Sequence, residues 1–449
     1  MLEKQSPDIV NKLYSDHLTE WSQRFSEACN AQNLDGIIIF SGVEKSRFRD
    51  DNEYPFYVEP YFRVWVPQVF PNSAIKIVPG RTPVLVHVQQ TDFWHEHPRD
   101  PTGFWTNHLD IISVPNTTKM FDELRISSSK LAAIGENSDL SMGFFSINNQ
   151  ILLDHLDFYR AFKTDYEVAC ITEANKIAAI GHAATQRELI QKSKNTSEFQ
   201  LNQVYCTATE QREFELPYQN IVALNEHAST LHYQNLDRNP PDKFLSFLLD
   251  AGATFNGYAS DITRTISGEN DHFDALIKSM NELQKKLCTR TTSDVSFVFL
   301  NELAHQLLAD VLEEHGLITT KAGESYERGI TRFFLPHGLG HLLGLQVHDK
   351  GGYLNSPRGP NEMPPIDHPF LRLTRTLEPG FVVTIEPGLY FIPSLLDRLK
   401  SCSLSNLVNW AQVEALIPYG GIRIEDNILV TCSGSRNLSR PALEKSGVS

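Results

Sequence analysis

The 449-residue sequence lacks any apolar run long enough to cross a membrane. Its longest apolar stretches are short, such as those at 37–40 and 247–249, whereas a transmembrane helix needs about 20 apolar residues. The first residues also lack the basic segment and the apolar segment of a secretory signal. These absences predict a cytoplasmic protein with no membrane partner.

Cysteine and basic residues are also scarce. The six cysteines are scattered and form no C-x-x-C pair, so the sequence predicts neither a disulfide framework nor a cysteine zinc site. Lys and Arg number 40 against 55 Asp and Glu, which gives a formal net charge of -15. Nucleic acids bind basic patches, so this balance argues against them as partners. A negative field also attracts divalent cations, although acidity that keeps a protein dissolved explains the charge equally well.

The chain is too long for one ordinary hydrophobic core, and two domains are expected. A boundary near 155–162 divides it into residues 1–158 and 159–449. Alternating helix and strand patterns in the first part predict an α/β domain, with a helix at 7–32 and strands at 36–40, 74–78, 83–88, 111–114 and 131–134. The second part begins with helices, predicted from capping boxes and periodicity at 164–189, 197 onward, 271–288 and 294–315.

Two aspartates frame a predicted β-hairpin in the second part. An apolar strand ends at Asp250, an Asn-Gly turn follows at 256–257, and a second strand carries Asp261. Across neighbouring strands these carboxylates can face each other. They repel on an apolar sheet, and therefore need a cation between them. On this segment alone, a turn role for Asp250 and a helix-cap role for Asp261 explain the pattern equally well.

Three histidines lie close together in a glycine-rich segment, at His337, His341 and His348. The glycines argue against a regular helix and for close approach of the backbone to something bound. His337 and His341 have the i, i+4 spacing of a zinc-binding helix, but Gly338 stands where the H-E-x-x-H motif requires glutamate. Histidines that cap loops are the alternative, and their density disfavours it.

Two later strands each end in a glutamate beside glycine or proline, Glu386 and Glu425. Either one alone would be an ordinary surface glutamate. Together with the two aspartates and one imidazole, they form an oxygen-rich site of net negative charge. Such a site suits two divalent ions, Mn²⁺ first, with Co²⁺ or Zn²⁺ as alternatives. Two ions that share a water lower its pKa from 15.7 toward about 7.

The order Asp250, Asp261, His341, Glu386 and Glu425 resembles the pita-bread metallopeptidases, which include methionine aminopeptidase, aminopeptidase P, prolidase and creatinase. Further segments resemble the bacterial prolidase (Xaa-Pro dipeptidase) branch, at 50–56, 62–65, 255–259, 345–349 and 421–427. The similarity spans nearly the whole chain, although Leu342 replaces an expected histidine. It implies an α+β pita-bread catalytic domain over 159–449 and hydrolysis of dipeptides with C-terminal proline.

The resemblance also implies a role for each metal ligand. Asp250 chelates one metal and His341 the other, while Asp261 and Glu425 bridge both. Glu386 binds the second metal and carries the proton from water to the leaving amine.

Other residues are assigned to the substrate by the same resemblance. His232 and His348 steady the tetrahedral intermediate, following the logic of an oxyanion hole. Arg372 holds the C-terminal carboxylate of the dipeptide. Arg423 supports the site from close by, and His337 orients a ligand.

The resemblance further implies a homodimer in which Asp51, from the N-terminal domain, completes the partner's pocket. It also implies a side activity on organophosphorus triesters, because tetrahedral phosphorus resembles the tetrahedral intermediate of peptide hydrolysis.

Two alternatives remain. Aminopeptidase P uses the same ligands on longer peptides, and a non-catalytic binding module would keep the fold. The presence of all five ligands argues against the second.

Overall fold

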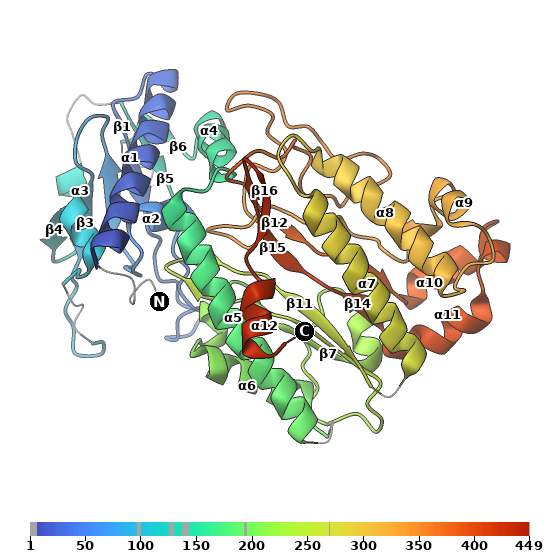
Figure 1. The fold of residues 1–449 in the computed structure, drawn as a ribbon. Coiled ribbons are helices and arrows are strands. Elements are labelled where there is room, and N and C mark those ends of the chain that lie inside the picture. Colours follow the sequence, from blue (N-terminus) through green and yellow to red (C-terminus); the bar gives the residue numbers. More distant parts are fainter. Residues whose placement is uncertain are drawn as a thin grey trace. The chain divides into compact units, whose positions relative to one another are not determined.

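The computed structural model describes residues 7–96, 100–124, 130–136, 143–192, 195–268 and 270–448, apart from the side chains of residues 7–9. The chain forms two compact units (Figure 1). The N-terminal unit contains Met1–Arg160, Thr164–Cys170 and Ser356–Pro360, and the C-terminal unit contains Ala161–Lys163, Ile171–Asn355 and Asn361–Ser449.

A mixed six-stranded sheet organises the N-terminal unit, with strand order β4-β3-β2-β1-β5-β6. Strand β1 pairs antiparallel with β2 and parallel with β5. The strands are β1 (Gly36–Phe40), β2 (Ala74–Ile77), β3 (Val84–Val88), β4 (Asp110–Val114), β5 (Leu131–Ile134) and β6 (Ser146–Ile147). The helices are α1 (Pro7–Gln32), α2 (Pro60–Trp65), α3 (Thr117–Leu124) and α4 (Gln150–Arg160). The predicted α/β class is confirmed. Among the elements of this unit, β6 and the helices α2, α3 and α4 had not been placed from the sequence.

Helices of very different length accompany the strands of the C-terminal unit, and the longest, α5 (Asp165–Gln191), begins in the part of the chain that belongs to the N-terminal unit. Helix α5 starts at the predicted capping box, where Glu167 N donates to Thr164 Oγ1 at 3.3 Å. The others are α6 (Glu198–Thr209), α7 (Asp271–Arg290), α8 (Phe297–Glu314), α9 (Ala322–Glu327), α10 (Pro393–Lys400), α11 (Trp410–Leu416) and α12 (Arg440–Ser446). Helix α7 packs along β11, β12, β14 and β16, with α8 beside it (Figure 1).

The strands of this unit form small antiparallel sheets rather than one continuous sheet. Their orders are β11-β8-β7, β12-β15-β16, β13-β14 and β10-β9. The strands are β7 (Ile221–Leu224), β8 (Ser246–Asp250), β9 (Thr254–Phe255), β10 (Tyr258–Ala259), β11 (Thr263–Ser267), β12 (Val382–Ile385), β13 (Gly388–Tyr390), β14 (Gly421–Arg423), β15 (Asp426–Thr431) and β16 (Gly434–Asn437). A bridge between Thr263 and Glu425 joins two of the sheets. Helices and antiparallel sheets occupy separate stretches of the chain, as in the predicted α+β class.

The predicted hairpin of the two aspartates is more elaborate than the sequence indicated. Strands β8 and β11 pair antiparallel and place Asp250 opposite Thr263. The turn at Asn256 and Gly257 joins only the short strands β9 and β10, which lie between the two long ones. Asp261 consequently stands just before β11 instead of within a strand.

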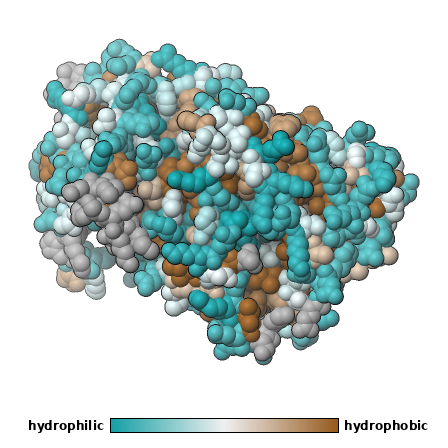
Figure 2. All heavy atoms as spheres, viewed as in Figure 1, coloured by the Kyte–Doolittle hydropathy of each residue, from teal (hydrophilic) through white to brown (hydrophobic). Residues whose placement is uncertain are grey.

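Among the described residues, no helix is long and apolar enough to cross a membrane. The face of the molecule in Figure 2 is mostly hydrophilic, with hydrophobic residues in small separate patches. Apolar side chains gather instead in buried clusters, the largest of which lies in the C-terminal unit and includes Phe273, Leu300, Phe381 and Ile428.

Candidate metal centre

A cavity of about 510 Å³ lies in the C-terminal unit. It is lined by every predicted site residue of that unit, namely His232, Asp250, Asp261, His337, His341, His348, Arg372, Glu386, Arg423 and Glu425. Residues more than 190 positions apart in the sequence thus share one hollow. Asp51 belongs to the N-terminal unit, where it is exposed.

The two aspartates share a hydrogen-bond donor that the sequence did not reveal. Tyr218 donates its hydroxyl to Asp250 Oδ1 at 2.8 Å and to Asp261 Oδ1 at 2.5 Å. Both carboxylates are buried. The tyrosine therefore fixes one oxygen of each aspartate and leaves the other oxygens to further partners.

His341 is held so that one ring nitrogen faces the carboxylates. Its Nδ1 lies 2.9 Å from Leu342 O, while its Nε2 lies 3.4 Å from both Asp261 Oδ2 and Glu386 Oε1. The backbone of this segment pairs with β12, where Thr384 N donates to His341 O. A Cβ atom at position 340 would lie 2.1 Å from Thr384 O, which explains the glycine there.

The glutamates come from the ends of neighbouring strands, as predicted. Glu386 directly follows β12, and its Oε1 accepts from Thr384 Oγ1 at 3.2 Å. Glu425 lies between β14 and β15, and its Oε2 accepts from Thr263 Oγ1 at 2.7 Å. Within the described part of the chain, Glu425 Oε1 is buried without a hydrogen-bond partner. A buried polar atom of this kind normally has a partner, which here points to a bound ion.

Burial raises the pKa of Asp261, and the negative charge of Asp250 adds to the effect. The pKa values of Glu386 and Glu425 are raised for the same reasons, burial first and neighbouring carboxylates second. Burial lowers the pKa of His341 to about 4, so its imidazole is neutral at pH 7 and able to act as a ligand. The carboxylate cluster is therefore unfavourable in its charged form unless cations neutralise it.

The residues present fit divalent ions. Ligand-type atoms of Asp261, His341 and Glu425 all lie within 4.8 Å of one another. Glu386 and Asp250 line the same cavity. Four carboxylates and one imidazole form a donor set typical of hard or borderline divalent cations.

Arg423 is bound to the wall of the cavity. Its guanidinium donates to Asp250 Oδ2 at 2.6 Å, to Tyr390 OH at 3.0 Å and to Thr263 Oγ1 at 3.2 Å. Tyr390 OH in turn lies 2.8 Å from His337 Nε2. Tyr390 therefore links Arg423 to His337, and the sequence did not indicate this residue.

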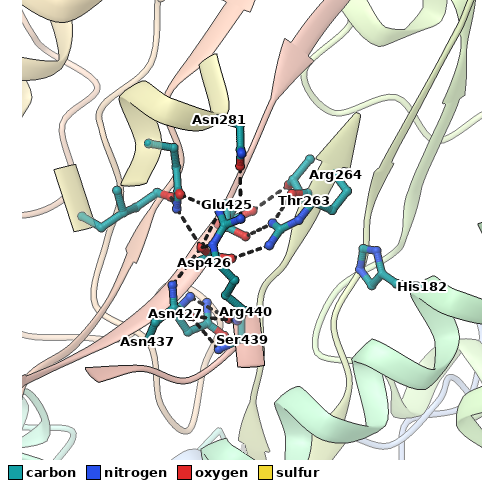
Figure 3. Close-up of polar contacts among 12 residues, drawn as sticks. His182, Thr263, Arg264, Asn281, Glu425, Asp426, Asn427, Asn437, Ser439 and Arg440 are labelled. Atoms are coloured by element: carbon teal, nitrogen blue, oxygen red, sulfur yellow. Dashed lines mark hydrogen bonds and ion pairs between the residues drawn. The ribbon is translucent and has the colours of Figure 1, made fainter. Parts of the chain in front are cut away.

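A second buried network lies behind Glu425 (Figure 3). Asp426 accepts from Arg264 at 2.7 Å and from Arg440 at 3.0 Å. Burial alone would raise the pKa of Asp426, but these two arginines lower it to about 2. Asn427 binds the backbone of Asp261 through both amide atoms, at 3.0 and 2.6 Å. The network thus fixes the main chain beside two ligand-type residues. Its one signal in the sequence was the run of polar residues 425–427 at the start of the buried strand β15.

The remaining predicted residues also line the cavity. His348 packs its ring edge-on against His341, with centroids 4.5 Å apart. His348 is exposed, but desolvation at the cavity wall and the nearby His341 lower its pKa to about 3. His232 and Arg372 are exposed at the cavity surface. Phe370, which the sequence did not single out, also lines the cavity beside Arg372.

Comparison with known proteins identifies relatives for both parts of the chain. Residues 12–158 match a family described as Xaa-Pro dipeptidase, N-terminal domain, and residues 169–432 match metallopeptidase family M24. An Xaa-Pro dipeptidase from Shewanella piezotolerans is 42% identical over 431 residues, which cover 95% of this chain and 97% of the relative. One from Serratia proteamaculans is 42% identical over 440 residues, which cover 96% of this chain and 99% of the relative.

Solved structures share the fold. Proline aminopeptidase P II from Yersinia pestis matches with a TM-score of 0.69 and 22% identity, over 94% of this chain and 96% of that one. An identity this low shows the fold alone. The predicted class, an N-terminal α/β domain followed by a pita-bread domain, is confirmed.

We predict that Asp261→Asn removes at least one metal ion while the fold persists. The change removes a charge from the centre of the cluster but keeps the size of the side chain. The metal content is measured by inductively coupled plasma emission spectrometry after equilibration with Mn²⁺ and dialysis. Circular dichroism shows whether the variant keeps its fold. Asp242→Asn, an exposed position before β8, is the control. Two ions retained by Asp261→Asn would contradict the ligand assignment.

Proposed function

The chain belongs to metallopeptidase family M24, and on this premise we propose that it is an Xaa-Pro dipeptidase that works with two divalent metal ions. The observation that carries this proposal is the convergence of four carboxylates and His341 on one cavity, in a chain similar over almost its entire length to Xaa-Pro dipeptidases. The expected substrates are dipeptides with C-terminal proline, and the expected compartment is the cytoplasm.

Asp250, Asp261, His341, Glu386 and Glu425 would hold the two ions. Mn²⁺ is the preferred candidate because the donor set is mainly oxygen, and Co²⁺ or Zn²⁺ are alternatives. Bound together, the ions would lower the pKa of a shared water and polarise the scissile carbonyl.

The side chains around the ions supply orientation and proton transfer. Glu386 takes the proton of the attacking water and passes it to the proline nitrogen as the peptide bond breaks. Thr384 Oγ1, 3.2 Å from Glu386 Oε1, holds this carboxylate in place. His232 and His348 donate to the oxygen of the tetrahedral intermediate, where negative charge develops.

Recognition of the C-terminal carboxylate limits the length of the substrate. Arg372, exposed at the cavity surface, offers a planar pair of donors to the C-terminal carboxylate. A longer peptide places an amide where that carboxylate would lie. This residue distinguishes the proposed dipeptidase from an aminopeptidase P, whose metal ligands would be the same.

The N-terminal domain, residues 1–158, is proposed to form a homodimer and to complete the partner's pocket with Asp51. The exposure of Asp51 leaves its carboxylate available for the free amine of a substrate.

A non-catalytic binding module is disfavoured because a full set of ligand-type residues lines the cavity.

We predict that the wild type cleaves Ala-Pro far faster than Ala-Pro-Gly. A hydrogen bond to a charged group contributes roughly 1.5–3 kcal/mol, so Arg372→Ala should lower kcat/KM for dipeptides about ten- to a hundredfold. Steady-state assays on both peptides measure this, with metal content as the control. Equal cleavage of the tripeptide would replace the dipeptidase assignment with aminopeptidase P.

The dimer proposal predicts that Asp51→Ala keeps its metal ions but raises KM for dipeptides, because an ion pair with the substrate amine is lost. Sedimentation velocity gives the oligomeric state and steady-state kinetics give KM. Asp16→Ala, at an exposed position of helix α1, is the control. A fully active monomer would refute the shared pocket.

We also propose a side activity on organophosphorus triesters, whose tetrahedral phosphorus resembles the tetrahedral intermediate of the peptide reaction. Release of p-nitrophenol from a diethyl triester by the Mn²⁺-loaded enzyme is the expected result, and Asp261→Asn should abolish it. Release that survives in this variant would mean that the activity does not come from the metal centre.

A further inference from the structure

Glu198, the first residue of helix α6, is a buried carboxylate with an unusually complete set of partners. Its side chain is 1% exposed. Oε1 accepts from the backbone N–H of Leu224 and from His227 Nδ1, both at 2.8 Å. Oε2 accepts from Tyr233 OH at 2.6 Å and from the backbone N–H of Asp237 at 2.8 Å. One side chain on a helix thus contacts four points of a separate segment.

These four donors enclose the loop at residues 225–237, which carries His232. Leu224 is the last residue of β7, and Asp237 closes the loop. The carbonyl of Asp237 also accepts from the backbone N–H of Phe199 in α6 at 3.1 Å. Tyr233 is buried, whereas its neighbour His232 is exposed at the cavity. The carboxylate therefore fixes the start, the middle and the end of the loop.

The loop needs an anchor because its backbone is not held by regular pairing. Apart from a 3-10 turn at Asn225–Ser229, it contains no helix or strand. Asn225 and Leu236 have φ angles of +57° and +52°, a left-handed conformation that a leucine rarely adopts. Leu236 directly precedes Asp237, whose N–H donates to Glu198.

A metal site is the alternative for this cluster, since ligand-type atoms of Glu198, His227 and Asp237 lie within 4.8 Å of one another. Both oxygens of Glu198 already accept two hydrogen bonds each. An ionised carboxylate offers about four lone-pair sites, and here all are occupied. The geometry is that of an anchor for a loop and leaves no lone pair for an ion.

We propose that Glu198 is a positioning residue that holds the loop at 225–237 so that His232 meets the developing oxyanion. This proposal rests on the proposed function, in which His232 stabilises the tetrahedral intermediate. Glu198→Gln replaces one acceptor oxygen by an NH₂ group, which faces two donors and cannot accept from them. The loop shifts, and because displacement by about 1 Å can cost up to a hundredfold, kcat falls while substrate binding is largely kept.

The test is a double-mutant cycle on the Mn²⁺-loaded enzyme with Ala-Pro, using Glu198→Gln, His232→Ala and both together. We expect Glu198→Gln to lower kcat about ten- to a hundredfold with KM changed less than about threefold. In the background of His232→Ala, the same change should have almost no further effect on kcat, because the residue acts through His232. Glu210→Gln, at the exposed end of the same helix, is the matched control.

Three results would overturn the proposal. They are an unchanged kcat in Glu198→Gln, a double mutant whose loss of kcat is the product of the two single losses, and a third metal ion per chain that Glu198→Gln removes. If Glu198→Gln fails to fold, Tyr233→Phe replaces it in the cycle, with a smaller loss in the same direction expected. Absence of dipeptide cleavage by the wild type would instead refute the proposed function. If the wild type cleaves the dipeptide but the two mutations lower kcat independently, only the role of Glu198 is refuted.

Discussion

Mutual repulsion among buried carboxylates is the constraint on which the catalytic half of this molecule depends. Asp261, Glu386 and Glu425 lie in one cavity with Asp250, and burial together with their neighbours raises their pKa values. Such a cluster destabilises the fold unless cations occupy it. Metal binding and the stability of this unit are therefore linked, since an ion that binds only the folded state stabilises it.

The surrounding fold holds the carboxylates in position against this repulsion. Tyr218 bridges the two aspartates, Arg423 neutralises part of the charge of Asp250, and Asn427 binds the main chain of Asp261. Each support comes from a different strand or loop. The loop of His232 is held in the same way, by hydrogen bonds to the buried carboxylate of Glu198. The positions of the ligand-type side chains thus depend on the buried hydrogen bonds around them.

The sequence predicted most strands of the N-terminal unit and singled out the candidate ligands, because both leave local signals: β-branched runs that end in a carboxylate, and glycines beside His341. It could not predict Tyr218, which lies 32 and 43 positions from the aspartates it binds and has no motif of its own. The capping box at Ser197 indicated the start of α6, but the partners of Glu198 depend on tertiary contacts. The turn at Asn256 was real, yet the short β9–β10 pair placed Asp261 outside a strand.

The proposed activity depends on two divalent ions shared by the carboxylates and His341. Anomalous diffraction from a crystal soaked in Mn²⁺, recorded at the manganese edge, tests it most directly. Two peaks about 3.5–4 Å apart, with Asp261 and Glu425 between them, are the predicted result. A single peak, or ions bound away from these residues, would contradict it.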